Sequence, residues 1–331
     1  MSQQQCLAIE QGKDYVNVDE ADLPYDHVEV LGQGGTGFVE KVKDRMTGKT
    51  YARKTIPIVK YRKKEDRETV FKTELKTIRG LEGHHHIIKI FATYVTSRKF
   101  GLILLPVASH GDLSNYLDNF WKIVDESALS HRDPRLNTMR LVLSRAFGCL
   151  AAGLAFMHVQ KVRHKDVKPG NILIHDGSVI YTDFGYSLDF SGFDRSTTEG
   201  VPNCISRKYS SPELSMHEPR NSKSDVFSLG CVFIEILSAL TLNQGLATTS
   251  NMAFSAMLDH VHEELHSIDV GVCPTELSRA IVGMTKREPS ERLCSIHAAE
   301  AILRMAGLCC STCRESPIQT WRESVNGDNC S

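Results

Sequence analysis

The sequence predicts an α+β protein in which β-strands come first and long buried helices follow. The stretch FVEKVKD at 38–44 alternates apolar and polar residues and leads through a turn into TGKTYARKTI at 47–56, a pattern of strand, turn and strand. Two later runs, 141–158 and 226–242, are mostly apolar. Each is short for a membrane span and each contains a charged residue, so both are predicted to be buried core helices.

The composition restricts the class of protein and its partners. The 331-residue chain is 41% hydrophobic, which suits one large or two small globular domains. Its 39 basic and 40 acidic residues nearly balance, so it has no overall attraction for nucleic acid or an acidic membrane. The start, MSQQQCLAIEQGKDYVNVDE, lacks the apolar centre of a signal peptide. We expect an intracellular protein, cytoplasmic and/or nuclear, that binds neither nucleic acid nor membrane.

Residues 1–25 and 306–331 are predicted to flank the folded domain, the second as a Cys- and Ser-containing tail that is either disordered, as we expect, or docked on the body of the protein. The ten cysteines are scattered, and a reducing compartment is expected for them. The tail contains CCSTC at 309–313. Three thiols in so short a stretch, with no pair of histidines nearby, make a poor zinc site, so we predict an ordinary tail there.

Two stretches compete for the role of a phosphoryl-transfer catalytic loop, HRDPRLN at 131–137 and HKDVKPGN at 164–171. Such a loop has the form H-R-D-x-x-x-x-N. The Asp takes the proton of the attacking hydroxyl and the Asn holds a metal on the nucleotide phosphates, so the spacing between them is fixed. The first stretch carries the perfect His-Arg-Asp tripeptide, and the second an imperfect one.

The spacing selects the second stretch. Five residues after Asp133 there is a threonine, whereas five residues after Asp166 there is Asn171. Lys168 follows Asp166 closely and is placed to neutralise charge on the transferring phosphate. A DFG tripeptide that begins at Asp183 lies downstream of the second stretch. The first stretch is predicted to be a proline-bearing surface turn between two helices.

A glycine-rich segment, LGQGGTGFVEKV, lies near the N-terminus at 31–42. Gly32, Gly34 and Gly37 form G-x-G-x-x-G, a pattern that dinucleotide-binding turns share. The dinucleotide turn leads from a strand into a helix, whereas here strands are predicted around the glycines. A glycine loop between two strands fits the flap that covers ATP phosphates, because glycine allows the backbone to approach them closely.

Lys54 ends the stretch YARK and is predicted to contact the α- and β-phosphates. Such a lysine needs an acidic partner on a helix. The spacing of apolar residues predicts a helix over 70–81, and Glu74 lies in its middle. Glu65 and Glu68 are rival partners, but they lie in a charged run that is more typical of a helix start or a solvated face.

Further downstream, SRKYSSPEL at 206–214 contains Ser-Pro-Glu, with Glu213 as its acid. Asp225 opens the apolar run that follows. Arg292, in KREPSERL, is a candidate buried partner for Glu213.

Taken together, these motifs resemble those of the eukaryotic protein kinases of the Ser/Thr class, over residues 26–305. The resemblance implies a two-lobed, protein-kinase-like fold. It has a small β-rich N-lobe with one helix at 26–105, a hinge at 106–108 and a larger, mainly helical C-lobe at 109–305. ATP and Mg²⁺ are the implied cofactors, bound between the lobes, and proteins with Ser or Thr acceptors are the implied substrates.

The resemblance also implies roles for individual residues. The catalytic residues are Asp166, Lys168, Asn171, Lys54 and Glu74. The nucleotide-binding residues are Leu31, Gly32, Gly34, Gly35, Gly37, Val39, Ala52, Lys54, Leu105, Pro106, Ala108, Asp112, Leu173 and Asp183. The Mg²⁺ ligands are Asn171 and Asp183. The activation segment contains Ser196, Thr197, Thr198, Ser206 and Glu213.

Ser/Thr specificity is implied by Lys168 and by Ser206, which stands where Ser/Thr kinases usually have a threonine. Two departures matter. Lys165 replaces the usual arginine and cannot form its bidentate grip on a loop phosphate. Gly170 stands where kinases directed to basic substrates often have a glutamate. Two alternatives stay open: a catalytically weak pseudokinase scaffold and a small-molecule phosphotransferase of similar fold. The sequence does not specify the substrate, the pathway or the oligomeric state.

Overall fold

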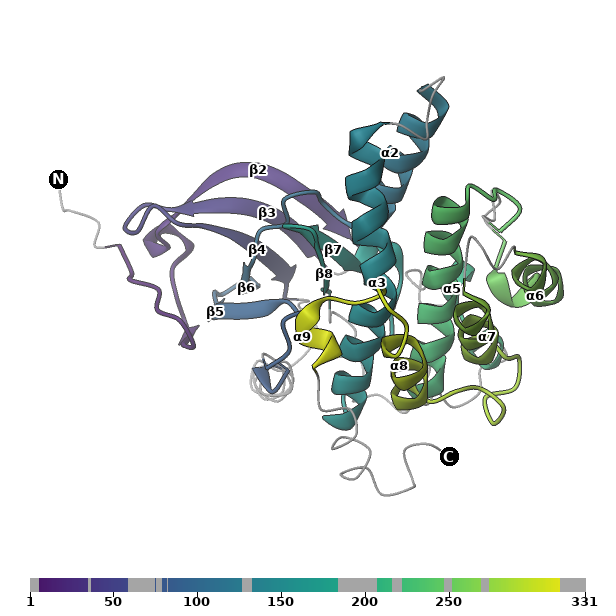
Figure 1. Cartoon of the computed structure of the whole chain (residues 1–331). Helices are drawn as coiled ribbons and strands as arrows, with labels where there is room; N and C mark the ends of the chain where they lie inside the picture. The colour runs from purple at the N-terminus through teal and green to yellow at the C-terminus, as the bar shows by residue number, and fades with distance from the viewer. Residues whose placement is uncertain are drawn as a thin grey trace. The chain divides into compact units, whose positions relative to one another are not determined.

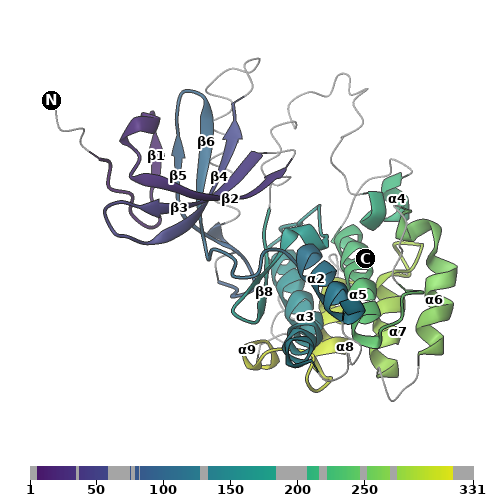
Figure 2. The same cartoon turned by 90° about the horizontal axis from the view of Figure 1, so that it is seen from above.

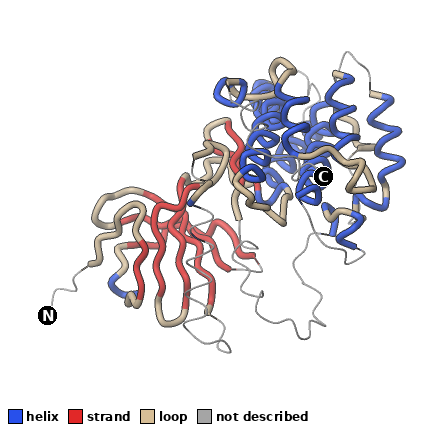
Figure 3. The backbone as a smooth tube through the Cα atoms, turned by 90° about the horizontal axis from the view of Figure 1, so that it is seen from below, coloured by secondary structure: helices blue, strands red, loops and turns tan. Residues whose placement is uncertain are grey.

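The computed structural model describes residues 6–34, 37–58, 75, 79–81, 83–126, 133–183, 207–215, 222–246, 252–268 and 274–315. Among these residues the chain forms two compact units, the first ending at Ser109 and the second beginning at His110. Strands dominate the first unit and helices the second (Figure 3). The β-rich and helical units of the kinase-like fold predicted from the sequence are therefore present.

The first unit is built on a six-stranded sheet (Figures 1 and 2). The strands, in chain order, are β1 (Asp14–Val16), β2 (Tyr25–Gly34), β3 (Gly37–Asp44), β4 (Thr50–Pro57), β5 (Lys89–Val95) and β6 (Lys99–Leu105). Their spatial order is β1-β5-β6-β4-β3-β2. β1 pairs with β5 in parallel and all other pairs are antiparallel. A short 3-10 helix, η1 (Glu20–Asp22), connects β1 to β2.

The strand–turn–strand pattern of the glycine segment is confirmed by β2, β3 and β4. Gly34 and Gly37 are the last paired residues of the β2–β3 hairpin. At Gly37 a side chain has no room, because a Cβ there would lie 2.4 Å from the carbonyl oxygen of Thr55 on β4. Glycine at this position therefore lets β3 pair closely with β4.

A hydrophobic cluster of the first unit packs on one face of this sheet. Val42, Ala92 and Ile103 are fully buried and come from three different strands. Tyr25 and Tyr51 meet edge to face, with ring centroids 6.1 Å apart. The N-terminal flank also contributes to the core, because Ile9 and Leu23 are buried in the same cluster. The burial of aromatic and branched side chains stabilises the sheet.

Most of the helix predicted over 70–81 lies outside the described residues. Leu75 and Arg79 are helical, and Leu75 and Leu81 are buried. Both leucines are apolar positions of the predicted period, and both lie in the interior.

The second unit is mainly helical. Its α-helices are α2 (Leu113–Glu126), α3 (Pro134–Val159), α4 (Pro212–Ser215), α5 (Ser222–Thr241), α6 (Leu258–Ser267), α7 (Thr275–Met284), α8 (Ser295–Leu303) and α9 (Ser311–Arg314). Its two strands, β7 (Ile172–His175) and β8 (Ser178–Tyr181), form an antiparallel pair. Its 3-10 helices are η3 (Pro169–Asn171), η4 (Arg207–Tyr209) and η5 (Phe254–Ala256).

The helices α3 and α5 form the centre of this unit and correspond to the two apolar runs. By length and composition alone both are long and apolar enough to cross a membrane. In the structure, however, 72% of the apolar window of α3 and 78% of that of α5 are buried within the protein. The rings of Phe147 and Phe233 lie 5.0 Å apart, one from each helix. Both runs are core helices, as predicted.

Candidate active site

The catalytic loop selected by spacing forms a hydrogen-bonded cluster around Asp166. The Lys168 ammonium lies 2.7 Å from Oδ2 of Asp166. The Asn171 side-chain amide donates to the same Oδ2 and to the Asp166 backbone carbonyl, each at 2.8 Å. The 3-10 turn η3 brings Asn171 back to Asp166 and makes these contacts possible. Three of the predicted catalytic residues therefore meet in one place.

The backbone of this loop is held by Asp225 from α5. Its carboxylate accepts the backbone N–H groups of His164 and Lys165, each at 2.8 Å. The His158 ring donates to the same carboxylate at 3.1 Å. Lys165 has a φ of +68°, a left-handed conformation that is unfavourable for a side-chain-bearing residue. The two charge-assisted hydrogen bonds from Asp225 stabilise that conformation.

Burial alone would raise the pKa of Asp225, but hydrogen bonding to His158 and the other groups around it lowers the pKa on balance. Asp225 is therefore an anion whose carboxylate accepts hydrogen bonds from the backbone of the loop. The sequence placed Asp225 only at the start of a helix and did not reveal this function. No local signal marks it, because its partners lie sixty residues earlier in the chain.

His164 links the loop to the segment that ends at Asp183. Its Nε2 donates to the carbonyl of Thr182 at 3.0 Å. Burial lowers the pKa of His164, although nearby carboxylates oppose the shift, so the ring stays neutral near pH 7. Asp183 follows with a φ of +57°. The loop and the predicted metal ligand Asp183 are thus connected through one buried side chain.

The donor set of this region fits a hard cation. Asp183 offers carboxylate oxygens, and Asn171 offers an amide oxygen whose orientation is fixed because the amide nitrogen is bonded to Asp166. Carboxylate and amide oxygens are the ligands that Mg²⁺ prefers. The residues present are therefore compatible with the predicted Mg²⁺.

The predicted phosphate-binding residues of the first unit lie on adjacent strands. Val39 on β3 is directly opposite Lys54 on β4, and Ala52 is two residues before Lys54, so these three side chains share one face of the sheet. Gly32 on β2 pairs with Val39. Only 6% of the surface of Lys54 is exposed. The lysine is thus a buried cation beside the glycine strands.

The remaining nucleotide-binding candidates occupy several places. Leu31 is exposed on β2, and Leu105 ends β6 and is joined to Pro106 by a cis peptide bond. Ala108 follows in the same unit. In the second unit, Asp112 forms an isolated antiparallel bridge with Leu173.

The carboxylate of Asp112 has a local structural role. It accepts the backbone N–H of Asn115 at 2.9 Å and the Asn115 side-chain amide at 3.0 Å, at the start of α2. A carboxylate that satisfies N–H groups here stabilises the helix end. A contact to ribose, as predicted for Asp112, would have to share these oxygens.

Several predicted site residues lie outside the described residues, namely Gly35, Glu74, Ser196, Thr197, Thr198 and Ser206. Their predicted roles stay predictions.

The pairing of Glu213 with Arg292 is confirmed. The guanidinium binds both carboxylate oxygens, with Nη1 2.9 Å from Oε1 and Nη2 3.1 Å from Oε2. Both residues are buried. Arg292 also donates to three backbone carbonyls, including that of Lys223, and Ser224 donates to Glu213. Burial alone would raise the pKa of Glu213, but the hydrogen bonds and the positive charge of Arg292 lower the pKa to about 2.

The competing aspartate, Asp133, has a different function. Its carboxylate accepts the backbone N–H of Arg135 at 2.8 Å and so forms the N-cap of α3, with Pro134 in the first turn. The Arg135 guanidinium also binds this carboxylate at 2.7 Å. Asp133 is therefore a helix cap, in agreement with the spacing argument that rejected it as the catalytic residue.

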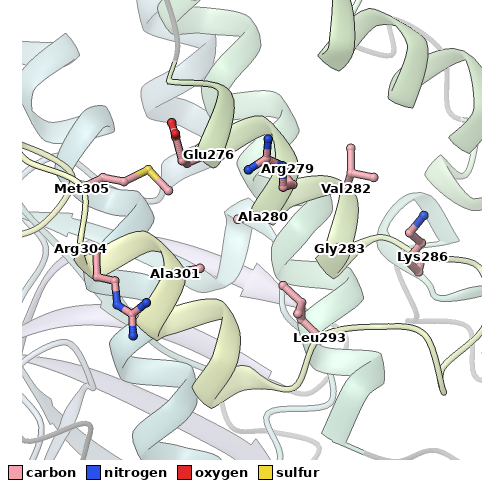
Figure 4. Close-up of a pocket in the computed structure, with 10 residues that line it drawn as sticks. All are labelled: Glu276, Arg279, Ala280, Val282, Gly283, Lys286, Leu293, Ala301, Arg304 and Met305. Carbon is pink, nitrogen blue, oxygen red and sulfur yellow. The ribbon is translucent and has the colours of Figure 1, made fainter.

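A separate pocket of about 760 Å³ lies between α7 and α8 (Figure 4). Its lining mixes small or apolar side chains with Arg279, Lys286 and Arg304. None of the catalytic-loop residues lines it. The pocket is thus distinct from the cluster at Asp166, and its cations provide control positions for tests of that cluster.

Comparison with known proteins agrees with this geometry. The model of the protein kinase domain family matches residues 25–305, and the chain belongs to this family. Its relatives include mitogen-activated protein kinase kinase kinase A of Dictyostelium discoideum, 27% identical over 67% of this chain and 22% of the relative. They also include cytokinesis protein sepH of Aspergillus niger, 30% identical over 66% of this chain and 15% of the relative.

A third relative is a serine/threonine-protein kinase H1 homolog of Pinctada fucata, 26% identical over 65% of this chain and 46% of the relative. The chain thus spans less than half of the length of each of these relatives.

Proposed function

We propose that this kinase-family protein is a serine/threonine protein kinase that transfers the γ-phosphate of ATP to Ser or Thr hydroxyls of protein substrates. The observation that carries the proposal is the convergence of Lys168 and Asn171 on the carboxylate of Asp166. In-line transfer needs a base, a cation beside the transferring group and a metal ligand, and these three side chains supply one of each.

Each residue has a definite task in this proposal. Mg²⁺–ATP supplies the γ-phosphoryl group when bound. Asp166 orients the acceptor hydroxyl and takes its proton, while the Lys168 ammonium offsets negative charge that develops on the phosphate. Asn171 and Asp183 provide oxygen ligands for Mg²⁺.

Lys54 is proposed to bind the α- and β-phosphates, with the glycine strands providing close backbone contact. Its position on β4 supports this, because Lys54 lies directly opposite Val39, which in turn pairs with Gly32 of the glycine strands. Glu74 is proposed as the protein partner of Lys54. Leu31, Val39, Ala52, Leu105 and Leu173 are proposed to contact the adenine.

The choice of Ser and Thr rests on Lys168, on Ser206 and on the name of the Pinctada relative. The buried Glu213–Arg292 pair supports a protein rather than a small molecule as substrate, because it fixes the segment that is expected to dock a peptide. We further propose an intracellular location, with no binding to nucleic acid or membranes.

The decisive experiment measures transfer of phosphate from ATP–Mg²⁺ to a generic protein and to the enzyme itself, with phosphosites mapped by mass spectrometry. We expect labelled Ser and Thr in the wild type, and at least a roughly 100-fold loss in Asp166→Asn and Lys54→Met. Lys286→Ala, which removes a cation of the α7–α8 pocket, serves as the matched control and should retain activity.

A wild type that binds ATP but transfers nothing, even after treatment with an activating kinase, would instead favour the pseudokinase scaffold. Transfer to a panel of metabolites without transfer to protein would favour the small-molecule phosphotransferase.

A further inference from the structure

The last described segment of the chain is fastened to the core helix α3. The backbone N–H of Gly148 on α3 donates to the carbonyl of Leu308 at 2.8 Å. A Cβ on Gly148 would lie 2.7 Å from Cβ of Cys309, so the absence of a side chain there allows the close approach. In Figure 1, α9 lies beside α3. Cys309 and Cys313 are buried as a result, which their positions in a predicted tail did not indicate.

This contact brings the sulfur of Cys149, which lies on α3, close to Cys310 of the tail. Cys149 comes from the middle of α3, and its Sγ accepts the backbone N–H of Cys310 at 3.3 Å. The Cys310 Sγ in turn accepts the backbone N–H of Cys313 at 3.4 Å. The Sγ atoms of Cys310 and Cys313 lie within 4.8 Å of each other.

The arrangement has the features of a thiolate site for a soft cation. Cys310 and Cys313 have the C-x-x-C spacing typical of zinc sites. Two backbone N–H groups point at the sulfurs of Cys149 and Cys310, and such bonds stabilise sulfur that carries negative charge and fix its direction. Among the described residues these cysteines are not in disulfides. Cys149 and Cys313 are almost fully buried, whereas Cys310 is partly exposed and gives an ion access.

We propose that Cys149, Cys310 and Cys313 bind a thiophilic closed-shell cation such as Zn²⁺, which joins the segment around α9 to α3. The role is structural, since none of these residues belongs to the loop around Asp166. The inference is independent of the proposed kinase activity. The sequence analysis argued against a metal here because it considered only the tail cysteines, whereas Cys149 lies far from the tail in the sequence.

Binding at this site is coupled to proton release. A bound cation replaces the thiol protons, because the ligand is the thiolate. Affinity should therefore fall as the pH is lowered, and binding should stabilise the folded protein.

The test uses the full chain in its reduced form. After gel filtration, the zinc content per chain is measured by mass spectrometry of the metal, and Co²⁺ is then exchanged in to detect the thiolate-to-cobalt charge-transfer band. We expect about one equivalent of zinc and a cobalt band in the wild type. Cys149→Ala, Cys310→Ser and Cys313→Ser should each weaken binding by at least about tenfold.

Cys294→Ser is the matched control, because Cys294 is a buried thiol of the same unit that contacts His297 instead of these sulfurs. It should bind zinc and cobalt like the wild type. If a cysteine variant fails to fold, the melting temperature of the wild type with and without added Zn²⁺ still tests the proposal, which expects a rise.

The proposal is overturned if the wild type neither retains zinc nor binds cobalt, or if all three variants bind as tightly as the wild type. Loss in Cys310→Ser and Cys313→Ser but not in Cys149→Ala would show that the ligand set is wrong. A disulfide among these cysteines in metal-free protein, with no zinc uptake after reduction, would identify a redox pair instead.

Discussion

Arg292 binds both carboxylate oxygens of Glu213 in the interior of the helical unit, across 79 positions of the chain. The guanidinium also lies over the ring of Phe227, 5.0 Å from its centroid. Arg292 therefore connects the segment around α4, the start of α5 and the chain that leads into α8.

Removal of this arginine should be strongly destabilising. In Arg292→Leu the buried Glu213 loses its partner and must either stay charged in the interior or take up a proton, and the change should cost about 3–5 kcal/mol of the free energy of unfolding. The quantity is measured by denaturant titration. Arg292→Lys should restore only part of the loss, because an ammonium cannot form the two-pronged contact. Equal stability of Arg292→Leu and the wild type would contradict a structural role for the pair.

Substitution of the two competing aspartates, Asp133 and Asp166, should affect different properties: the first thermal stability and the second kinase activity. Asp133→Asn and Asp166→Asn each replace one aspartate by its neutral isostere. We expect Asp166→Asn to lose kinase activity with little change in melting temperature. Asp133→Asn should keep its activity and lose a little thermal stability at most, since asparagine also caps helices. Loss of activity in Asp133→Asn alone would reverse the assignment of the catalytic loop.

The neutral buried His164 predicts a pH dependence of stability. Its pKa in the folded protein lies below the ordinary value of 6.5, so below pH 6.5 the unfolded chain takes up a proton that the folded protein does not. The free energy of unfolding should therefore decrease as the pH falls below 6.5, by at most about 1.4 kcal/mol per pH unit from this group.

Unfolding titrations between pH 7.5 and 5 would measure this slope, and His164→Tyr, which lacks the titrating ring, provides the comparison. The variant should be less sensitive to acid over this interval. If both proteins lose stability in parallel, His164 does not make this contribution.

The glycine hairpin offers a matched pair of substitutions. Gly37→Ala places a Cβ 2.4 Å from the Thr55 carbonyl oxygen, which forces β3 away from β4 and should cost about 1–3 kcal/mol. At Gly32 an added Cβ meets no atom within 4 Å. Thermal unfolding should distinguish Gly37→Ala from Gly32→Ala. Equal melting temperatures would show that the strands adjust to the methyl group.

The parts of the site that depend on local spacing were predictable from the sequence. Asp166, Lys168 and Asn171 lie within one short loop, so the distance between them along the chain almost determines their geometry. The strands around the glycines were predictable from the alternation of side chains. In the same way, Asp133 could be rejected because its neighbours have the wrong spacing.

Contacts between distant segments were harder to predict. Asp225 holds the catalytic loop because α5 packs against α3, and Cys149 meets the tail cysteines because the segment around α9 packs against α3. The residues that flank Asp225 and Cys149 in the sequence contain no pattern that predicts these contacts. Arg292 was found because a kinase resemblance suggested where to look, and the structure then confirmed its pairing with Glu213.

Because Asp225 binds the backbone of the catalytic loop, this loop can take its folded conformation only after α5 has been synthesised. Translation reaches His164, Lys165 and Asp166 well before it reaches the carboxylate that receives their backbone. A nascent chain released before Asp225 therefore contains every catalytic side chain of the loop, but it lacks the anion that offsets the unfavourable backbone of Lys165. Such truncated products should therefore be unable to hold this loop in its folded conformation.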